Sequence, residues 1–447
     1  MKMRWVISAL LISILGLSTL ALAQQTQTIV LKAYVIGPGP MGIKKATNLE
    51  LAAERLNQIL MAAGANVRVE VEVEFSELKW GPFAEKFYLD FAAGKAPDIV
   101  TMRETGELAA EGFIVPMDDH VKKFWELNYF DFYSNLWGGA TYEGKIWGIP
   151  HDIAPAGVWY RKDVLRELGY SDEEIATLLP NDGDTTLETL ARLAKEAVDA
   201  GLVEYGILHR PKKGSNTYAR LLEFGIDCYN SETGNLELER GKLLAFFQWH
   251  KEMVEQGVIP PEPPTWSTIH GTFVEGKTFA TLASHVGTPA EWKAKYGLTD
   301  EALENDLGFL PFPPTEAAKA AGGKAVSVSD IPLYFVTSQS QHPELAKLLI
   351  MFATSPEACA IHSAYSLRPP YRKSALDLLT DVEYVLRVAP SAQAVVPVPI
   401  HPRIWDFVGR IFEGIKGVEA GVVSPEQVLE DLVAWFQAEI PDGEIVP

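Results

Sequence analysis

The sequence predicts an α/β fold, because short apolar strands alternate with amphipathic helices along most of the chain. Residues 67–75 alternate valine with arginine or glutamate, which is typical of a strand with one buried face. Residues 48–63 carry leucine, alanine and isoleucine at helical spacing, with Asn48 as the expected N-cap and Gly64 as the stop. The order strand, helix, strand, helix, strand at this spacing favours a sheet with crossover helices.

The remaining elements follow from the same periodicities. In the first part we expect strands at 28–36 and 98–101, a Gly/Pro turn at 37–42, and helices at 82–93 and 105–111. Further on we expect strands at 145–149, 157–160, 277–283 and 333–337, a short helix ending at Gly276, and helices at 162–168, 186–200, 242–256 and 343–353.

Breaks rich in proline and glycine near residues 150, 312 and 367 indicate two lobes, with the chain passing between them more than once. We therefore expect an N-terminal lobe made of residues 24–150 and 314–366. The C-terminal lobe would hold residues 151–313 and 367–447.

The N-terminus resembles a secretory signal peptide. Lys2 and Arg4 precede an apolar run that ends at Ala21-Leu22-Ala23, and polar residues follow without a basic stop-transfer cluster. We predict that residues 1–23 are removed and that the mature protein is periplasmic; the alternative is a membrane anchor. No cysteine lies near the cut, so a lipid anchor is not expected.

Composition narrows the classes of partner. Hydrophobic residues make up 47% of the 447, as in a folded globular protein, and the net charge is −20. Loss of Lys2 and Arg4 would make it −22. Such a surface repels nucleic acid and anionic lipid, which excludes both as partners. For Cys228 and Cys359, the only cysteines, we favour buried free thiols over a disulfide.

Residues 271–278 read GTFVEGKT, the pattern of a phosphate-binding loop. That loop needs a strand before it and a helix after it, so that backbone amides meet the phosphates at a helix start. Here the expected order is helix and then strand. We interpret the motif as a decoy.

Residues 37–42 read GPGPMG and match a dinucleotide-binding fingerprint between a strand and a helix. Pro38 and Pro40 lack the amide hydrogens that such a loop donates, so no cofactor is expected. Lys44 and Lys45 open the next helix and could face a polar or anionic ligand group; solvated lysines are the equal alternative.

The chain carries none of the catalytic or metal-binding motifs GxSxG, HExxH or CxxC, and its nine histidines are scattered. Any two of its 59 acidic residues could form a glycosidase pair, which is uninformative. Binding without chemistry, and without a metal, is therefore the expectation.

Several segments together resemble the extracellular solute-binding proteins of ABC sugar importers, the family that contains maltose-binding protein. They keep the family's order along the chain, and their sequences are AAGKAPDIV at 92–100, EGFIVPMDD at 111–119, YEGKIWGIP at 142–150, WYRKDVL at 159–165, FVEGKTFA at 273–280, QHPELAK at 341–347 and SLRP at 366–369. The chain departs from the family pattern at Arg161, where asparagine is usual, at Ala280, where methionine is usual, and in its first loop.

The resemblance implies a two-lobed periplasmic binding protein fold of type II, with a hinge of crossing strands and a ligand cleft between the lobes. The site of such a protein would combine aromatic platforms with charged groups in loops after strands. On this basis the predicted ligand-binding residues are Lys45, Trp80, Glu104, His151, Asp152, His285, Trp292, Asp330, Arg368 and Trp405. Trp405 stands where the family carries a late ligand-stacking tryptophan. Core packing is the alternative for each tryptophan, and an ion pair or hinge contact for Asp152 and Arg368.

The expected function is that of a monomeric receptor that delivers a sugar or oligosaccharide to the membrane permease of an ABC importer. One alternative is a receptor for a phosphorylated or acidic polyol, motivated by Lys44, Lys45 and Arg368. Another is a secreted carbohydrate-active hydrolase.

Overall fold

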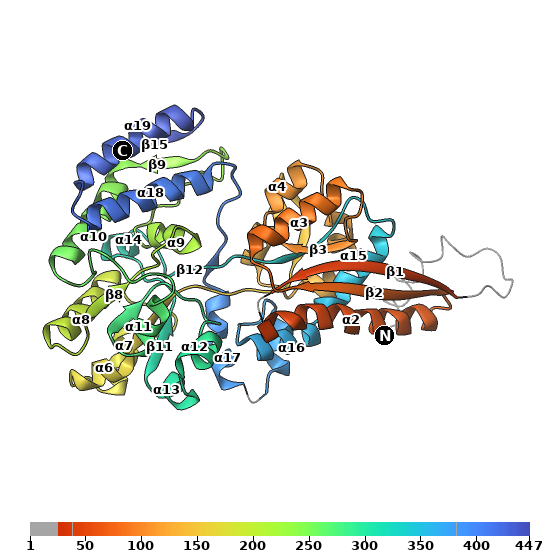
Figure 1. The fold of residues 1–447 in the computed structure, drawn as a ribbon, viewed down its shortest axis with the longest axis horizontal. Coiled ribbons are helices and arrows are strands. Elements are labelled where there is room, and N and C mark those ends of the chain that lie inside the picture. Colours follow the sequence, from red (N-terminus) through yellow and green to blue (C-terminus); the bar gives the residue numbers. More distant parts are fainter. Residues whose placement is uncertain (1–25, 38, 381) are drawn as a thin grey trace. The chain divides into compact units, whose positions relative to one another are not determined.

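The computed structural model describes residues 26–37, 39–380 and 382–447 (Figure 1). The predicted signal peptide lies outside these residues. The described chain forms two compact units. Unit 1 comprises the described residues up to Asp152, together with Ile331–Ser366 and 370–380, and unit 2 comprises Ile153–Asp330, Leu367–Pro369 and Val382–Pro447. Each unit is a mixed α/β body, which confirms the predicted fold class.

Unit 1 is built on a five-stranded sheet in the order β2-β1-β3-β13-β6. Strand β1 (Gln27–Ile36) pairs in parallel with both β2 (Val67–Ser76) and β3 (Ile99–Met102). Strand β13 (Leu333–Val336) runs antiparallel to β3 and to β6 (Gly148–Pro150), so β6 is parallel to β3. The carboxyl ends of β1, β2, β3 and β6 therefore lie on one edge of the sheet.

The first helix begins earlier than the sequence predicted. Helix α2 spans Gly39–Ala62 rather than starting after Asn48. Proline is tolerated in a first helical turn, where amides have no intrahelical partner, so Pro40 does not delay the start. Asn48 is not an N-cap: its side chain is buried and Nδ2 donates to the Ala358 carbonyl at 3.0 Å.

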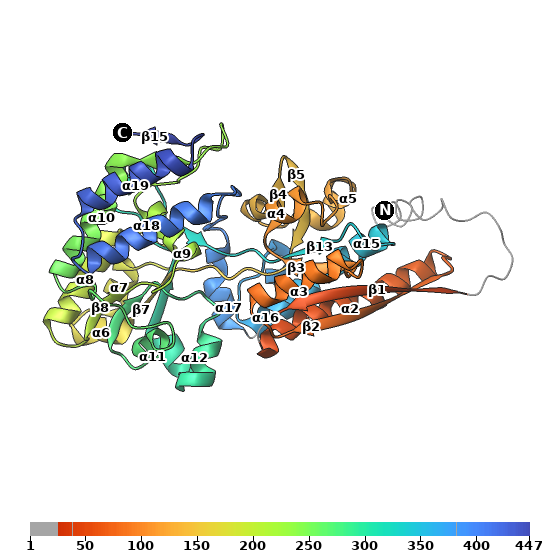
Figure 2. The ribbon, with the colours of Figure 1, turned by 45° about the horizontal axis from the view of Figure 1, so that its top comes forward.

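The other helices of unit 1 pack around the sheet (Figures 1 and 2), and those predicted at 82–93, 105–111 and 343–353 match their predicted positions closely. They are α3 (Trp80–Ala92), α4 (Thr105–Ala110), α5 (Asp118–Phe124), α15 (Pro343–Ala353) and α16 (Pro356–Ser366), with a π-helical turn at Trp125–Tyr129 and 3-10 turns at Ser134–Ala140 and Lys373–Leu378. A small hairpin joins β4 (Thr141–Tyr142) to β5 (Lys145–Ile146).

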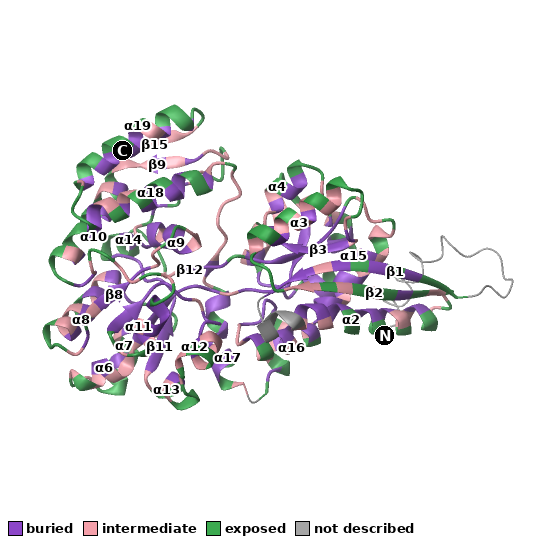
Figure 3. Cartoon of the chain, in the orientation of Figure 1, coloured by how far each residue is buried: buried purple, intermediate pink, exposed green. Residues whose placement is uncertain are grey.

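Unit 2 contains a four-stranded sheet in the order β11-β7-β10-β8. Strand β10 (Thr278–Thr281) is parallel to β8 (Tyr205–Leu208), and β7 (Val158–Arg161) is antiparallel to β10 and to β11 (Leu307–Leu310). The residues of β10 and β11 are all buried, so this sheet is the centre of the unit's core (Figure 3).

Helices α10 (Arg240–Glu255), α18 (Ile404–Glu419) and α19 (Pro425–Glu439) of unit 2 pack on one another (Figure 2). The other helical elements are α6 (Lys162–Glu167), α7 (Asp172–Leu178), α8 (Leu187–Asp199), α9 (Ser215–Glu223), α11 (Ile269–Val274), α12 (Pro289–Tyr296), α13 (Asp300–Asn305), α14 (Glu316–Ala320), α17 (Glu383–Val388) and a 3-10 turn at Ala389–Ala392. Two short parallel pairs join β12 (Ser327–Val328) to β14 (Val395–Val396) and β9 (Glu237–Glu239) to β15 (Glu444–Val446).

Two predicted lobe boundaries differ from the unit boundaries of the structure. Residues 314–330 belong to unit 2, because Thr315 donates its amide to Glu223 and β12 pairs with β14. Residues 370–380 belong to unit 1, where Lys373 donates its amide to Asp131. The Pro/Gly breaks at 312 and 367 therefore mark loops, whereas the contacts that follow them decide the unit.

Cys228 and Cys359 are buried free thiols, one in each unit, which confirms the preferred prediction. Within the described residues, no helix has the length and apolar character needed to span a bilayer.

Candidate functional site

Five of the predicted site residues follow parallel strands of unit 1 at their carboxyl ends. Ligands of open α/β sheets bind at this edge, because the loops after the strands converge there. Lys45 lies in α2 after β1, Trp80 starts α3 after β2, and Glu104 follows β3. His151 and Asp152 come directly after β6. The structure separates these five into an accessible group and a buried group.

The accessible group consists of Trp80, Glu104 and a third residue, Arg103. The guanidinium carbon of Arg103 lies 4.7 Å from the centroid of the Trp80 ring, in cation–π range. Its Nε lies 3.2 Å from Glu104 Oε1, and both charged side chains remain about one-third exposed, at 32% and 34%. An indole beside a carboxylate and a guanidinium is the set of groups that a sugar's apolar face and hydroxyl edge require. Sequence reasoning missed Arg103, although it is the first residue after a strand.

The buried group contains Lys45, Asp152 and His151. Lys45 Nζ lies 3.1 Å from Asp152 Oδ2, and His362 Nε2 lies 2.9 Å from Asp152 Oδ1. Asp152 has no exposed surface, so the ion-pair alternative describes it in this structure. These side chains are almost completely buried, so they stabilise the unit and are not accessible to a ligand from solvent.

His151 is buried and stacks on Tyr334, with ring centroids 4.0 Å apart. Burial, with a smaller contribution from the Lys45 charge, holds the pKa of His151 well below its usual value. The imidazole is therefore neutral at physiological pH and acts as an aromatic core residue.

In unit 2, His285 and Arg368 lie close together beside Gly287. A methyl group on Gly287 would come within 3.0 Å of Arg368 Nε and 3.3 Å of His285 Cε1. His285 Nδ1 accepts a hydrogen bond of 3.0 Å from the Gly287 amide, which fixes the ring. Both side chains are partly exposed, so this pair can meet a ligand with hydroxyl or anionic groups.

The other three predicted residues of unit 2 differ in their exposure to solvent, since one is buried and two are exposed. Trp292 is fully buried in α12, and its ring packs on Trp159 and Phe273 with centroids 5.2 and 5.0 Å away. This is the core position given as its alternative. Trp405 is 42% exposed in the first turn of α18, and Asp330 is exposed in the loop after β12.

A second arginine–tryptophan pair, which the sequence did not single out, occurs in unit 2. Arg210 follows β8, and its guanidinium carbon lies 4.7 Å from the centroid of the Trp266 ring. Trp266 in turn meets the edge of His270, at a centroid distance of 5.1 Å. Trp266 comes just after the proline-rich loop at 260–264, and that loop position is the signal that could have identified it.

The phosphate-loop motif has the reversed order that the sequence predicted. Helix α11 ends at Val274, Gly276 adopts a left-handed turn with φ of 78°, and β10 starts at Thr278. Thr278 is buried and its hydroxyl donates to the Ala280 carbonyl at 3.1 Å. A strand and not a helix follows this loop, so the geometry does not fit a nucleotide phosphate.

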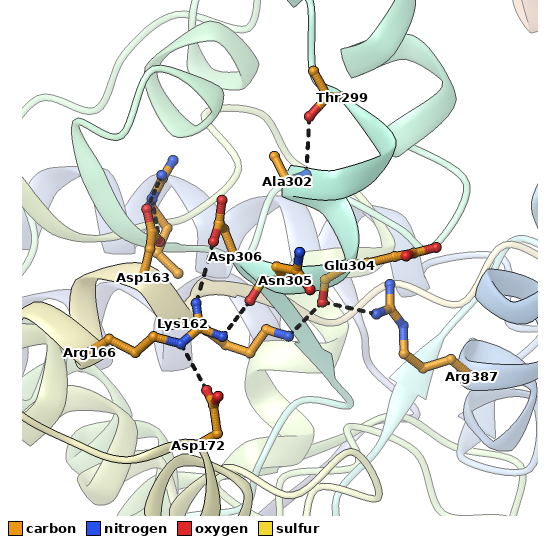
Figure 4. A network of polar contacts seen from close by, with 11 residues as sticks. Lys162, Asp163, Arg166, Asp172, Thr299, Ala302, Glu304, Asn305, Asp306 and Arg387 are labelled. Atoms are coloured by element: carbon orange, nitrogen blue, oxygen red, sulfur yellow. Dashed lines mark hydrogen bonds and ion pairs between the residues drawn. The ribbon is translucent and has the colours of Figure 1, made fainter.

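Three cationic side chains of unit 2 donate hydrogen bonds to backbone carbonyls in one polar network (Figure 4). Lys162 Nζ donates to the Glu304 carbonyl at 2.8 Å, and Arg166 donates to the Asn305 carbonyl at 2.7 Å. Arg387 donates to the carbonyls of Leu303 and Glu304. These are the last carbonyls of α13, which lack helical partners and carry the negative end of the helix dipole. The cations therefore cap a helix.

Three residues of types that bind metals come together in unit 2, although their sequence spacing gave no indication of it. His209, His250 and Glu419 are buried in unit 2, and one ligand atom from each lies within 4.8 Å of the others. The motif search missed them because they lie on three separate elements.

Comparison with known proteins finds one matching family and several solved structures of similar fold. The family model described as bacterial extracellular solute-binding protein matches residues 56–359. Among solved structures, a cyclo/maltodextrin-binding protein complexed with maltotetraose has a TM-score of 0.69 at 21% identity, covering 94% of this chain and 99% of that one. The sugar-binding protein MalE from Xanthomonas citri has a TM-score of 0.72 at 18% identity, covering 93% and 98%. An extracellular solute-binding protein from Staphylococcus aureus in complex with maltose has a TM-score of 0.65 at 17% identity, covering 92% and 98%.

Proposed function

The chain belongs to the bacterial extracellular solute-binding protein family, and on this premise we propose that it is the carbohydrate receptor of an ABC importer. It is exported by its signal peptide to the periplasm, acts there as a monomer, and delivers a sugar or oligosaccharide to a membrane permease. The sugar-bound proteins of the same fold support the class of ligand.

The observation that carries the proposal is the accessible group Trp80, Arg103 and Glu104 at the carboxyl edge of the unit 1 sheet. Stacking on an indole contributes about 1 kcal/mol, and a hydrogen bond to a charged group about 1.5–3 kcal/mol. Micromolar affinity corresponds to about 8 kcal/mol. One such group supplies only part of this free energy. In unit 2, described by itself, His285, Arg368 and the Arg210–Trp266 pair are proposed as ligand contacts.

The proposal assigns no catalysis to the protein. Glu104 Oε1 is paired with Arg103, and Asp152 is paired with Lys45 and His362 in a buried position. A glycosidase needs one carboxyl group held protonated beside a second that is ionised, both facing the substrate. Neither Glu104 nor Asp152 has that environment, which favours binding over hydrolysis.

A receptor for an acidic or phosphorylated polyol is the second candidate, and Arg368 beside His285 favours it. The lysines that first suggested this ligand are engaged elsewhere. Lys45 pairs with Asp152, and Lys44 Nζ lies 4.0 Å from the centroid of the Tyr365 ring. Anion recognition would therefore depend on Arg103, Arg210 and Arg368.

A thermal-shift screen against oligosaccharides, monosaccharides, polyols and sugar phosphates tests the function, because a ligand that binds the native state raises Tm. We expect the largest shift with an oligosaccharide, followed by a calorimetric Kd for that compound. Trp80→Ala should weaken its binding by about 5- to 10-fold, the loss of one stacking contact. Trp125→Ala is the matched control, since Trp125 is 38% exposed in unit 1 but follows no strand of the five-stranded sheet.

Two outcomes overturn the proposal. One is a protein that binds no carbohydrate or polyol in the screen while remaining folded. The other is release of reducing sugar from the compound that it binds, which would make it a hydrolase.

A further inference from the structure

A buried cluster of three metal-ligand types lies inside unit 2. His209 follows β8, His250 lies in the middle of α10, and Glu419 is the last residue of α18. Their side chains are 7%, 1% and 1% exposed. Charged groups are rarely buried this deeply unless they are paired or hold a cation.

The distances within the cluster converge on the Glu419 carboxylate. His209 Nε2 lies 2.9 Å from both Glu419 oxygens, and His250 Nδ1 lies 2.7 Å from Oε1. The three elements that carry these residues are otherwise joined by apolar packing, with Phe246 and Phe247 of α10 and Ile415 of α18 in the same core.

The hydrogen positions follow from the neighbouring acceptors. His209 Nδ1 lies 3.1 Å from the Arg210 carbonyl oxygen, which can only accept, so Nδ1 carries a hydrogen. Nε2 then faces an ionised carboxylate and must present either a second hydrogen or a bound cation. A histidine whose second ring nitrogen donates to a carbonyl is the arrangement that orients metal-ligating histidines.

His250 completes the cluster through Nδ1, which lies 2.7 Å from Glu419 Oε1. His250 Nε2 is buried and makes no hydrogen bond.

We propose that His209, His250 and Glu419 form a divalent transition-metal site of the zinc type, with His209 Nε2, His250 Nδ1 and a Glu419 oxygen as protein ligands. Two imidazoles and one carboxylate are a known ligand set for Zn²⁺, with water in the fourth position. Bonds of about 2.0–2.1 Å in tetrahedral geometry separate ligand atoms by about 3.3 Å. Each histidine nitrogen must therefore move roughly 0.5 Å farther from the Glu419 oxygen on binding.

Each ligand atom must present a lone pair to the metal. Zn²⁺ takes the lone pair of His209 Nε2, any hydrogen held there leaves to solvent, and Nδ1–H stays on the Arg210 carbonyl. His250 presents the lone pair of Nδ1 and carries its hydrogen on Nε2, and the Glu419 carboxylate supplies the anionic ligand. The metal would cross-link β8, α10 and α18, so it is assigned to stability of unit 2 rather than to ligand recognition.

The test uses the full mature chain, stripped of metal with a chelator and then titrated with Zn²⁺ at neutral pH. Because the cluster is buried, the titration is done both on the native protein and on protein refolded with Zn²⁺ present. We expect one tightly bound zinc and a higher Tm.

Variants and a spectroscopic probe separate this site from adventitious binding. Glu419→Gln keeps the size of the side chain and should weaken zinc binding by at least about 100-fold. His342→Gln, a partly exposed histidine of unit 1, should leave binding unchanged. Because Glu419→Gln could unfold the protein, Co²⁺ is also added to the unaltered chain, where the visible bands of four-coordinate cobalt are expected. Substoichiometric zinc, cobalt that stays octahedral, or equal zinc binding by folded Glu419→Gln overturns the proposal.

Discussion

Lys45 Nζ and Asp152 Oδ2 lie 3.1 Å apart inside unit 1, and their side chains are 7% and 0% exposed. Asp152 is also the last residue of that unit before the chain enters unit 2 at Ile153. An ion pair thus fixes the first helix to the end of strand β6. The two residues entered the predicted site as ligand contacts, and in the structure they hold the sheet edge together.

Replacing one partner of this pair should destabilise unit 1 strongly. In Asp152→Asn the Lys45 charge stays buried without its carboxylate, which costs about 3–5 kcal/mol in the free energy of unfolding. The exposed pair Arg55–Glu357, also 3.1 Å apart in unit 1, supplies the control. Glu357→Gln should cost less than about 1 kcal/mol. Urea unfolding of both variants measures the difference, and equal losses would contradict this account.

A pH effect is expected from His120. This side chain is buried in α5, and burial lowers its pKa to about 3, assisted by the charges of Lys347 and Lys123. Because the folded-state pKa lies below the unfolded value, stability is complete above about pH 6.5 and falls as the pH drops toward 3. By pH 5 the loss from this group is about 2 kcal/mol.

His120→Gln removes that titration, so its unfolding free energy should change less between pH 7 and 5 than that of the natural chain, by about 2 kcal/mol. His342→Gln, in the same unit, should keep the full pH dependence. Parallel pH profiles for the natural chain and His120→Gln would disprove the assignment.

The β11–β7 pair of unit 2 depends on a glycine. A Cβ on Gly308 would lie 2.1 Å from Cζ of Tyr160. Tyr160 is buried, and its hydroxyl donates to the Leu179 carbonyl at 3.1 Å, so the ring cannot move aside freely. Gly308→Ala should therefore destabilise by about 1–3 kcal/mol or more.

Gly81 in α3 is the control, since a Cβ there meets no atom within 4 Å. Gly81→Ala should be neutral or stabilise by up to about 1 kcal/mol, because alanine loses less backbone entropy in a helix. Chemical denaturation monitored by tryptophan fluorescence compares the two. A neutral Gly308→Ala would show that this strand register is wrong.

The two cysteines should be unreactive in the native state. Burial raises the pKa of Cys359 to about 12 and also raises the pKa of Cys228, so neither presents a thiolate. A thiol reagent should modify neither residue in buffer and both in denaturant, without prior reduction. Modification that needs a reductant would instead show a disulfide, contrary to the free thiols of the structure.

Local patterns were sufficient for most secondary structure. The valine alternation at 67–75 became β2 and the reversed order around Gly276 became α11 and β10, because both depend on neighbours within a few residues. The start of α2 was placed too late, since apolar periodicity begins only at residue 48, whereas backbone hydrogen bonding continues back to Gly39.

The candidate site was predicted less completely. Trp80, Glu104, His285 and Arg368 were chosen as polar or aromatic residues near predicted strand ends or crossings, and the structure leaves each partly exposed there. The same rule placed Trp292 and Asp152 on the list although both are buried. Distance from a strand end is a local property, but exposure depends on which distant segments cover the side chain.

The sequence by itself determined the class of protein: its α/β alternation, its charge, its export signal as an expectation, and the ordered segments that indicate a solute-binding family. Only the tertiary structure decided which side chains meet. His209 and Glu419 are 210 positions apart and yet share hydrogen bonds inside unit 2. Periodicity records how a segment interacts with water and with its own turns, whereas such pairs arise from the packing of whole elements, which no short stretch of sequence encodes.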